Sequence, residues 1–121
     1  MKQEDFNELF RNRTKGLALS VIKITSGMAY SDALGVIRKQ LLRSTTSVAA
    51  NFRAVCRARS NKEVFAKLCI VVEEADETLF WIELLVEGKF ILEKEMREIY
   101  KEALEILKVM SAYKKKLSFN H

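Results

Sequence analysis

Apolar residues recur along the chain at steps of three, four and seven, which is the spacing that lines one face of an α-helix. Four such segments are visible, over about residues 3–28, 31–58, 61–87 and 93–117. The links between them are short, so consecutive helices must lie side by side and run in opposite directions. The pattern therefore predicts an all-α fold, an antiparallel up-down-up-down four-helix bundle with shallow crossing angles.

Signals at the helix ends support this division. Ser31, followed by Asp32, offers an N-cap oxygen and an acid in the first turn of the second helix. The Ser-x-x-Glu spacing of Ser60 and Glu63 is that of a capping box, in which each side chain accepts a hydrogen bond from the other residue's backbone N–H. Gly88 follows the third segment, and we expect it to close that helix in the left-handed conformation.

The composition strengthens the helical interpretation. The 121 residues include no proline and only four glycines, and 49% are hydrophobic, which favours long uninterrupted helices over disorder or a β fold. A chain of this length builds one core, so we expect residues 1–121 to form a single domain. No uncharged stretch approaches the roughly 20 apolar residues of a membrane span, and we expect no membrane partner.

Both cysteines, Cys56 and Cys69, fall inside predicted helices, and no signal peptide is recognisable before them. The disulfide framework of a secreted protein is therefore not expected, and we predict reduced thiols and a cytoplasmic location. The two residues also lack a nearby histidine and the spacing of metal ligands. We interpret them as packing residues.

Charge is distributed unevenly along the sequence. Residues 1–62 carry 12 Lys and Arg against 4 Asp and Glu, whereas residues 63–121 carry 9 against 12. Such a split can serve attraction within or between subunits, or it can leave a basic face free for a polyanion.

The basic residues of the second predicted helix form a stripe. At 100° per residue they lie opposite the apolar side of the helix, and one more follows just past its end. The candidate nucleic-acid-binding residues are Lys39, Arg43, Arg53, Arg57 and Arg59. The centre of the stripe is small, because Thr46 and Ala50 occupy it. We interpret the stripe as a surface for phosphate, which arginine binds in two places at once; the alternative is a solvated face or a subunit contact.

The third predicted helix is apolar on more than one side. Four large residues point away from its inner face: Ile70, Phe80, Trp81 and Leu84. A monomer would expose them, and an exposed cluster with Trp and Phe is typical of a protein interface. We predict a homo-oligomer that uses these residues, the alternative being that loops or the N-terminal segment cover them.

The acidic run over residues 73–77, with Glu83 beyond it, raises the question of a carboxylate-bridged metal site. In helical bundles such sites combine glutamates with Glu-x-x-His pairs, and the one histidine here is His121. We predict no metal and no cofactor, and we interpret the acids as salt-bridge partners of the arginines on the second helix. Asn51 is interpreted as a partly buried residue with local hydrogen bonds.

No Gly-rich phosphate loop is visible, and no nucleophile lies beside a base, so we predict a protein that is not an enzyme.

The middle of the chain resembles a known family. The stretches that carry the resemblance are QLLRSTTSVAANFRA at residues 40–54, RARS at 57–60, Phe65, Lys67, EEADET at 73–78 and WIELL at 81–85. They are similar to bacterial four-helix-bundle proteins first noted as reading frames in intervening sequences of 23S ribosomal RNA genes, sometimes mislabelled ribosomal protein S23.

The resemblance implies a four-helix protomer assembled into a homo-oligomeric ring or barrel, commonly a pentamer. It also implies a distant likeness to the accessory protein of diversity-generating retroelements, which binds nucleic acid and a reverse transcriptase through a basic surface. Our preferred hypothesis is a non-enzymatic homo-oligomer that binds RNA or DNA through the stripe. The rival is a protein-interaction scaffold in which the same arginines pair with Glu73, Asp76, Glu77 or Glu83 of a neighbouring helix or subunit.

Overall fold

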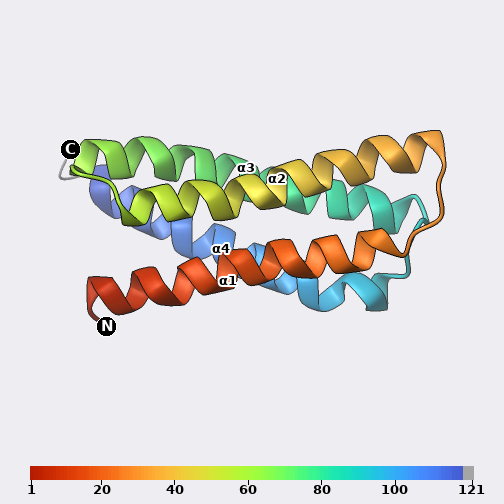
Figure 1. The fold of residues 1–121 in the computed structure, drawn as a ribbon, viewed down its shortest axis with the longest axis horizontal. Helices are drawn as coiled ribbons and strands as arrows, with labels where there is room; N and C mark the ends of the chain where they lie inside the picture. The colour runs from red at the N-terminus through yellow and green to blue at the C-terminus, as the bar shows by residue number, and fades with distance from the viewer. Residues whose placement is uncertain (119–121) are drawn as a thin grey trace.

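The structure is a computed structural model, and it describes residues 1–118. This part of the chain folds into four antiparallel helices. They are α1 (Gln3–Ser26), α2 (Asp32–Cys56), α3 (Asn61–Glu87) and α4 (Glu93–Ser118). The helices run along the long axis of the molecule, and the start of α1 and the end of α4 lie at the end that holds the α2–α3 connection (Figure 1). Each helix packs on the next, and α1 also contacts α4. The predicted all-α, four-helix architecture is confirmed.

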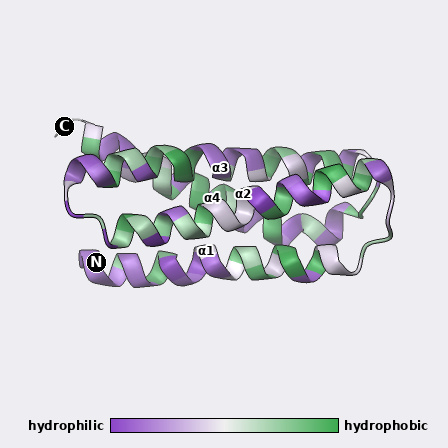
Figure 2. Cartoon of the chain, turned by 45° about the horizontal axis from the view of Figure 1, so that its top comes forward, coloured by the Kyte–Doolittle hydropathy of each residue, from purple (hydrophilic) through white to green (hydrophobic). Residues whose placement is uncertain are grey.

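The interior divides into two apolar clusters along the bundle. The cluster nearer the termini includes Phe10, Phe52, Leu68 and Met110, and the other includes Leu41, Ile82 and Met96. In the first, the Phe6 ring lies edge-on to Tyr113, with 5.5 Å between ring centroids, and so joins the start of α1 to the end of α4. Figure 2 shows the corresponding alternation of hydrophobic and hydrophilic positions along each helix.

Within residues 1–118, no helix combines the length and the apolar character needed to cross a membrane.

The predicted N-caps form, with one difference. Ser31 Oγ accepts a hydrogen bond from the Leu34 N–H at 3.1 Å, and Ser60 Oγ accepts one from the Glu63 N–H at 3.1 Å. The Glu63 carboxylate, however, accepts from the N–H of Arg59 at 3.3 Å, whereas a capping box requires the N–H of Ser60. The second half of the box is therefore displaced by one residue.

The end of α3 differs from the prediction for Gly88. Its φ is −77°, in the right-handed region, and the left-handed residue is Lys89, with a φ of 61°. The Lys89 N–H donates to Val86 O at 3.0 Å and the Phe90 N–H donates to Leu85 O at 2.9 Å, which is a Schellman motif with Lys89 at its left-handed position. Glycine is favoured at position 88 because of limited space, since a Cβ there would lie 3.0 Å from the Phe90 ring.

This geometry predicts opposite effects for two neighbouring substitutions. Gly88→Ala should lower the free energy of unfolding by about 1 kcal/mol, because the added Cβ meets the Phe90 ring and Leu84 O. Lys89→Gly should raise it by about 0.5 kcal/mol, because glycine adopts a positive φ without steric cost. Urea denaturation of both variants measures the two changes, and destabilisation by Lys89→Gly would contradict the assignment.

Candidate nucleic-acid interface

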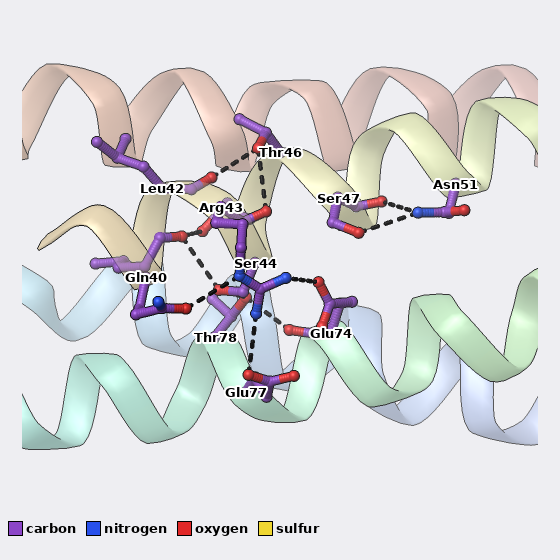
Figure 3. A network of polar contacts seen from close by, with 12 residues as sticks. Gln40, Leu42, Arg43, Ser44, Thr46, Ser47, Asn51, Glu74, Glu77 and Thr78 are labelled. Atoms are coloured by element: carbon purple, nitrogen blue, oxygen red, sulfur yellow. Dashed lines mark hydrogen bonds and ion pairs between the residues drawn. The ribbon is translucent and has the colours of Figure 1, made fainter. Parts of the chain in front are cut away.

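Arg43, one of the five predicted basic residues, is engaged in ion pairs with α3 on the outer side of the bundle. Its Nη1 lies 2.7 Å from Glu74 Oε2 and its Nη2 lies 3.1 Å from Glu77 Oε1, while its Nε donates to Gln40 Oε1 at 3.0 Å. Figure 3 shows the guanidinium between the two carboxylates of α3. Arg43 therefore joins α2 to α3. Such salt bridges between the acidic run at residues 73–77 and the arginines of this helix were predicted from the sequence.

Two buried hydroxyls lie beneath this ion pair. The Ser44 and Thr78 side-chain oxygens are 3.0 Å apart, across the contact between α2 and α3 (Figure 3). Each is also within hydrogen-bonding distance of a carbonyl of its own helix, Leu41 O for Ser44 and Glu74 O for Thr78. Because both side chains are small and hydrogen-bonded, the two helices can approach closely without leaving a buried polar group unpaired.

The two carboxylates around Arg43 titrate differently. Burial works to raise the pKa of Glu74, but hydrogen bonds with Glu77, Arg43 and Ser47 outweigh it, and the pKa lies below its ordinary value of 4.5. Contact with the Glu74 carboxylate raises the pKa of Glu77, which is the more exposed of the two. The pair is therefore arranged so that Glu74 keeps its charge opposite the Arg43 guanidinium.

Arg53 and Arg57 lie on a different surface, in an open groove of about 760 Å³ between α1 and α2. The residues that line it, here called the basic groove, are Arg11, Asn12, Lys15, Ala18, Thr46, Ala49, Ala50, Arg53, Cys56 and Arg57. Arg11 and Lys15 come from α1 and were missed by the sequence analysis. The sequence feature that could have revealed them is their spacing of four residues, with Ala18 three residues further on, which places all three on one side of a helix.

The basic groove is unbalanced in charge. Its lining contains four cationic side chains and no carboxylate. Among residues 1–118 the side-chain ion pairs are Arg13–Glu102, Arg43 with Glu74 and Glu77, and Arg97–Glu93, and none of them uses a cation of the groove. The positive charge is therefore available to an anionic ligand.

Cys56 lies in the wall of the basic groove as a half-buried free thiol. Burial raises its pKa, and the neighbouring Arg11 offsets only part of this increase. The thiol therefore stays protonated at neutral pH.

The remaining two predicted residues are exposed but lie outside the lining of the groove. Lys39 is on the outer side of α2 towards its N-terminal half, and Arg59 is in the α2–α3 connection, two residues beyond Arg57. The structure thus brings Arg53 and Arg57 together with Arg11 and Lys15, and separates them from Arg43.

The predicted interface residues Ile70, Phe80, Trp81 and Leu84 follow one side of α3, here called the α3 outer face. Ile70 is 38% exposed and Phe80 is 49% exposed, and the other two are half-buried. The Phe80 and Trp81 rings meet edge-on, with 4.9 Å between centroids. Trp81 Nε1 is buried and has no hydrogen-bond acceptor in the part of the chain that the structure describes.

Other polar residues singled out in the sequence have local partners. Asn51 is half-buried and its Nδ2 donates to Ser47 O at 2.9 Å, and Glu83 accepts a hydrogen bond from the Tyr100 hydroxyl at 2.7 Å. Residues 1–118 contain no group of three or more potential metal ligands. His121 lies outside the described residues.

The fold and the groove together define a small helical-bundle protein with a basic surface and an apolar surface on different helices. The family described as 23S rRNA-intervening sequence protein matches residues 9–112, and the chain belongs to this family. Its fold is also that of a protein of unknown function from the S23 ribosomal protein family of Bacteroides thetaiotaomicron VPI-5482, with a TM-score of 0.82 and 28% sequence identity over 90% of this chain and 97% of that one. No curated protein matches the sequence.

Because Arg43 is ion-paired within residues 1–118 and the groove arginines are not, replacing Arg43 should lower the free energy of unfolding more than replacing Arg53. Arg43→Gln leaves Glu74, whose side chain is 10% exposed, without its cation. We expect a loss of about 1–2 kcal/mol in unfolding free energy near neutral pH, limited by solvent screening because the guanidinium is half-exposed. Arg53→Gln, the matched control on the same helix, should stay within about 0.5 kcal/mol of the parent.

The same comparison has a defined pH dependence. The pKa of Glu74 is lowered in the folded state, so its stabilising effect is present above 4.5 and is lost as the pH falls through the folded value. The difference between the parent protein and Arg43→Gln should therefore shrink below about pH 4.5, since protonation of Glu74 removes the unpaired charge. A difference that stays constant from pH 7 to pH 3 in chemical denaturation would show that the ion pair is not its source.

Proposed function

We propose that this protein is a non-catalytic nucleic-acid-binding protein that contacts phosphate through the basic groove. The observation that supports this function is the convergence of Arg11 and Lys15 from α1 with Arg53 and Arg57 from α2, in a groove without a carboxylate. Cations left unpaired by the fold repel one another, and an anionic ligand removes that repulsion.

The chemistry of the groove suits phosphate. Three of its four cations are arginines, whose planar guanidinium donates two parallel hydrogen bonds to a phosphate group. Its other walls are formed mainly by small side chains, including Ala49 and Ala50, which leave room for a backbone to approach. The Thr46 hydroxyl donates to a carbonyl of its own helix, Leu42 O, at 2.7 Å, and not to a side chain that could act as a general base. This arrangement favours binding over nucleophilic catalysis.

The test is a comparison of two double variants with equal loss of charge. Arg53→Gln/Arg57→Gln removes two cations from the groove, and Lys94→Gln/Lys101→Gln removes two exposed cations from α4. The first should weaken binding of labelled RNA or DNA at least tenfold at low salt, at about 1 kcal/mol per charge-assisted contact, while the second should change it less than threefold. Fluorescence anisotropy titration measures both affinities.

Light scattering on the same proteins separates this function from the rival scaffold. If the arginines pair with acids of a neighbouring subunit, the groove variant dissociates; if they bind nucleic acid, its mass is unchanged and only retention of nucleic acid falls. No binding by the parent protein in low salt would refute the proposed function itself.

A second candidate function, self-association, is favoured by the α3 outer face. We propose that copies of the chain associate through Ile70, Phe80, Trp81 and Leu84, forming a homo-oligomeric ring or barrel such as a pentamer. The support is the exposed Phe80 ring, which meets the half-buried Trp81 edge-on, together with the exposed Ile70 on the same side of the helix. A partner surface would cover the Phe80 and Ile70 side chains.

Phe80→Asp is expected to reduce the assembly to a smaller species, because it places a charge in the middle of the apolar contact. Leu19→Asp is the control, since Leu19 is 58% exposed on α1, a helix that does not contact α3 in the described residues. Light scattering coupled to size-exclusion chromatography reports the mass of each. An unchanged mass for Phe80→Asp, or an equal loss for both variants, would contradict the assignment.

A further inference from the structure

We infer that the basic groove takes the phosphate backbone of a double helix, in preference to an unpaired strand, and that it does so without reading sequence. The inference rests on the proposed function and specifies its ligand. It follows from what lines the groove, how its cations are spaced, and where further positive charge lies on the bundle.

The lining of the groove has no aromatic side chain. Proteins that hold single strands combine basic surfaces with aromatic rings on which unpaired bases stack. The aromatic residues of α1 and α2, the two helices that form the groove, are directed inward within residues 3–26 and 32–56: Phe6 packs against Phe10, Phe52 and, on α4, Tyr113. Tyr30, although exposed, belongs to the α1–α2 connection at the opposite end of the molecule. An unpaired base would therefore find no ring to stack on in the groove.

The cations form two short rows on rigid supports. Arg11 and Lys15 are four residues apart on α1, and Arg53 and Arg57 are four residues apart on α2, a rise of about 6 Å in each helix. Both rows stand on helices whose inner faces are buried, so the separation of the two backbones that carry them is fixed before a ligand arrives. A duplex presents phosphates in an equally fixed array, whereas a flexible strand must lose conformational freedom to match it.

Further cations lie beyond the groove, at the end of the bundle that holds Arg57. Arg59 and Lys62 follow Arg57 in the α2–α3 connection and the first turn of α3, and Lys114 and Lys115 lie in the last turns of α4. These segments lie at the end of the molecule where α1 begins and α4 ends (Figure 1). Arg59 and Lys62 therefore add two cations beyond the groove for a rodlike polyanion, beside the Glu63 carboxylate, which accepts from the Arg59 N–H.

The groove has little with which to read bases. Direct readout uses amide and carboxylate side chains as well as arginine, and the lining has one amide, Asn12, and no carboxylate. Contacts to phosphate alone fix position without specifying sequence.

The experiment compares ligands with equal numbers of phosphates. Duplexes of about 20 base pairs, two unrelated sequences each of RNA and DNA, are titrated against an oligouridine of about 40 nucleotides in about 0.1 M salt. We expect at least one duplex type to bind about tenfold tighter than oligouridine, with its two sequences agreeing within about twofold. The RNA and DNA arms show which helix geometry the groove prefers. Arg53→Gln should reduce the slope of log K against log salt by about 0.9 for the duplex.

Alkylation of the two cysteines locates the bound duplex. Cys56 lines the groove and Cys69 is a half-buried free thiol on α3, so the second is an internal control for the first. Duplex should slow the modification of Cys56 several-fold and leave the rate at Cys69 unchanged, as mass spectrometry after a timed maleimide pulse would show.

The outcomes separate the inference from the function on which it rests. Oligouridine binding as tightly as duplex overturns the inference and leaves the proposed function intact, whereas binding of neither ligand overturns both. A duplex that binds tightly without protecting Cys56 shows that another surface is used, and a large difference between the two sequences refutes readout of the backbone alone.

Discussion

The contact between α2 and α3 fixes how α2 is rotated about its own axis, and the rest of the surface chemistry depends on that rotation. Arg43 holds Glu74 and Glu77, and Ser44 meets Thr78 directly beneath. Arg53 lies ten residues further along α2, so it is turned by roughly 80° from Arg43. Because Arg43 points towards α3, Arg53 points towards α1. The basic groove is a consequence of this geometry.

The acidic residues are distributed so that the groove remains unpaired. α3 supplies the carboxylates that neutralise Arg43, and α4 supplies Glu102, which holds Arg13 of α1 at 2.6 Å and 2.9 Å. Each of these pairs faces a seam other than the one between α1 and α2. The two helices rich in acid thus neutralise cations on their own sides of the bundle and do not reach the groove. The uneven charge along the sequence becomes an uneven charge across the molecule.

The sequence predicted most of the fold because helix periodicity and capping are local properties. The N-caps at Ser31 and Ser60 need only their own neighbours, and both form as expected. The prediction for Gly88 was wrong, because the choice between Gly88 and Lys89 depends on where the Phe90 ring packs. The candidate site was recovered only in part. A projection of α2 as an isolated cylinder shows a single stripe, and it cannot show that α3 takes Arg43 or that Arg11 approaches from α1.

The two candidate surfaces are separated by the topology. Among the described residues, α1 contacts α2 and α4 but not α3, so α1 and α3 are diagonal in the bundle. Association through the α3 outer face therefore leaves the seam between α1 and α2 uncovered by the same contact. Each copy in such an assembly would then present its own groove, and a long polyanion could engage several of them at once. Linked binding of that kind raises the overall affinity far above that of one groove without any new contact. The four cations of one groove would then need to supply only part of the binding energy, because the copies of the assembly would share it.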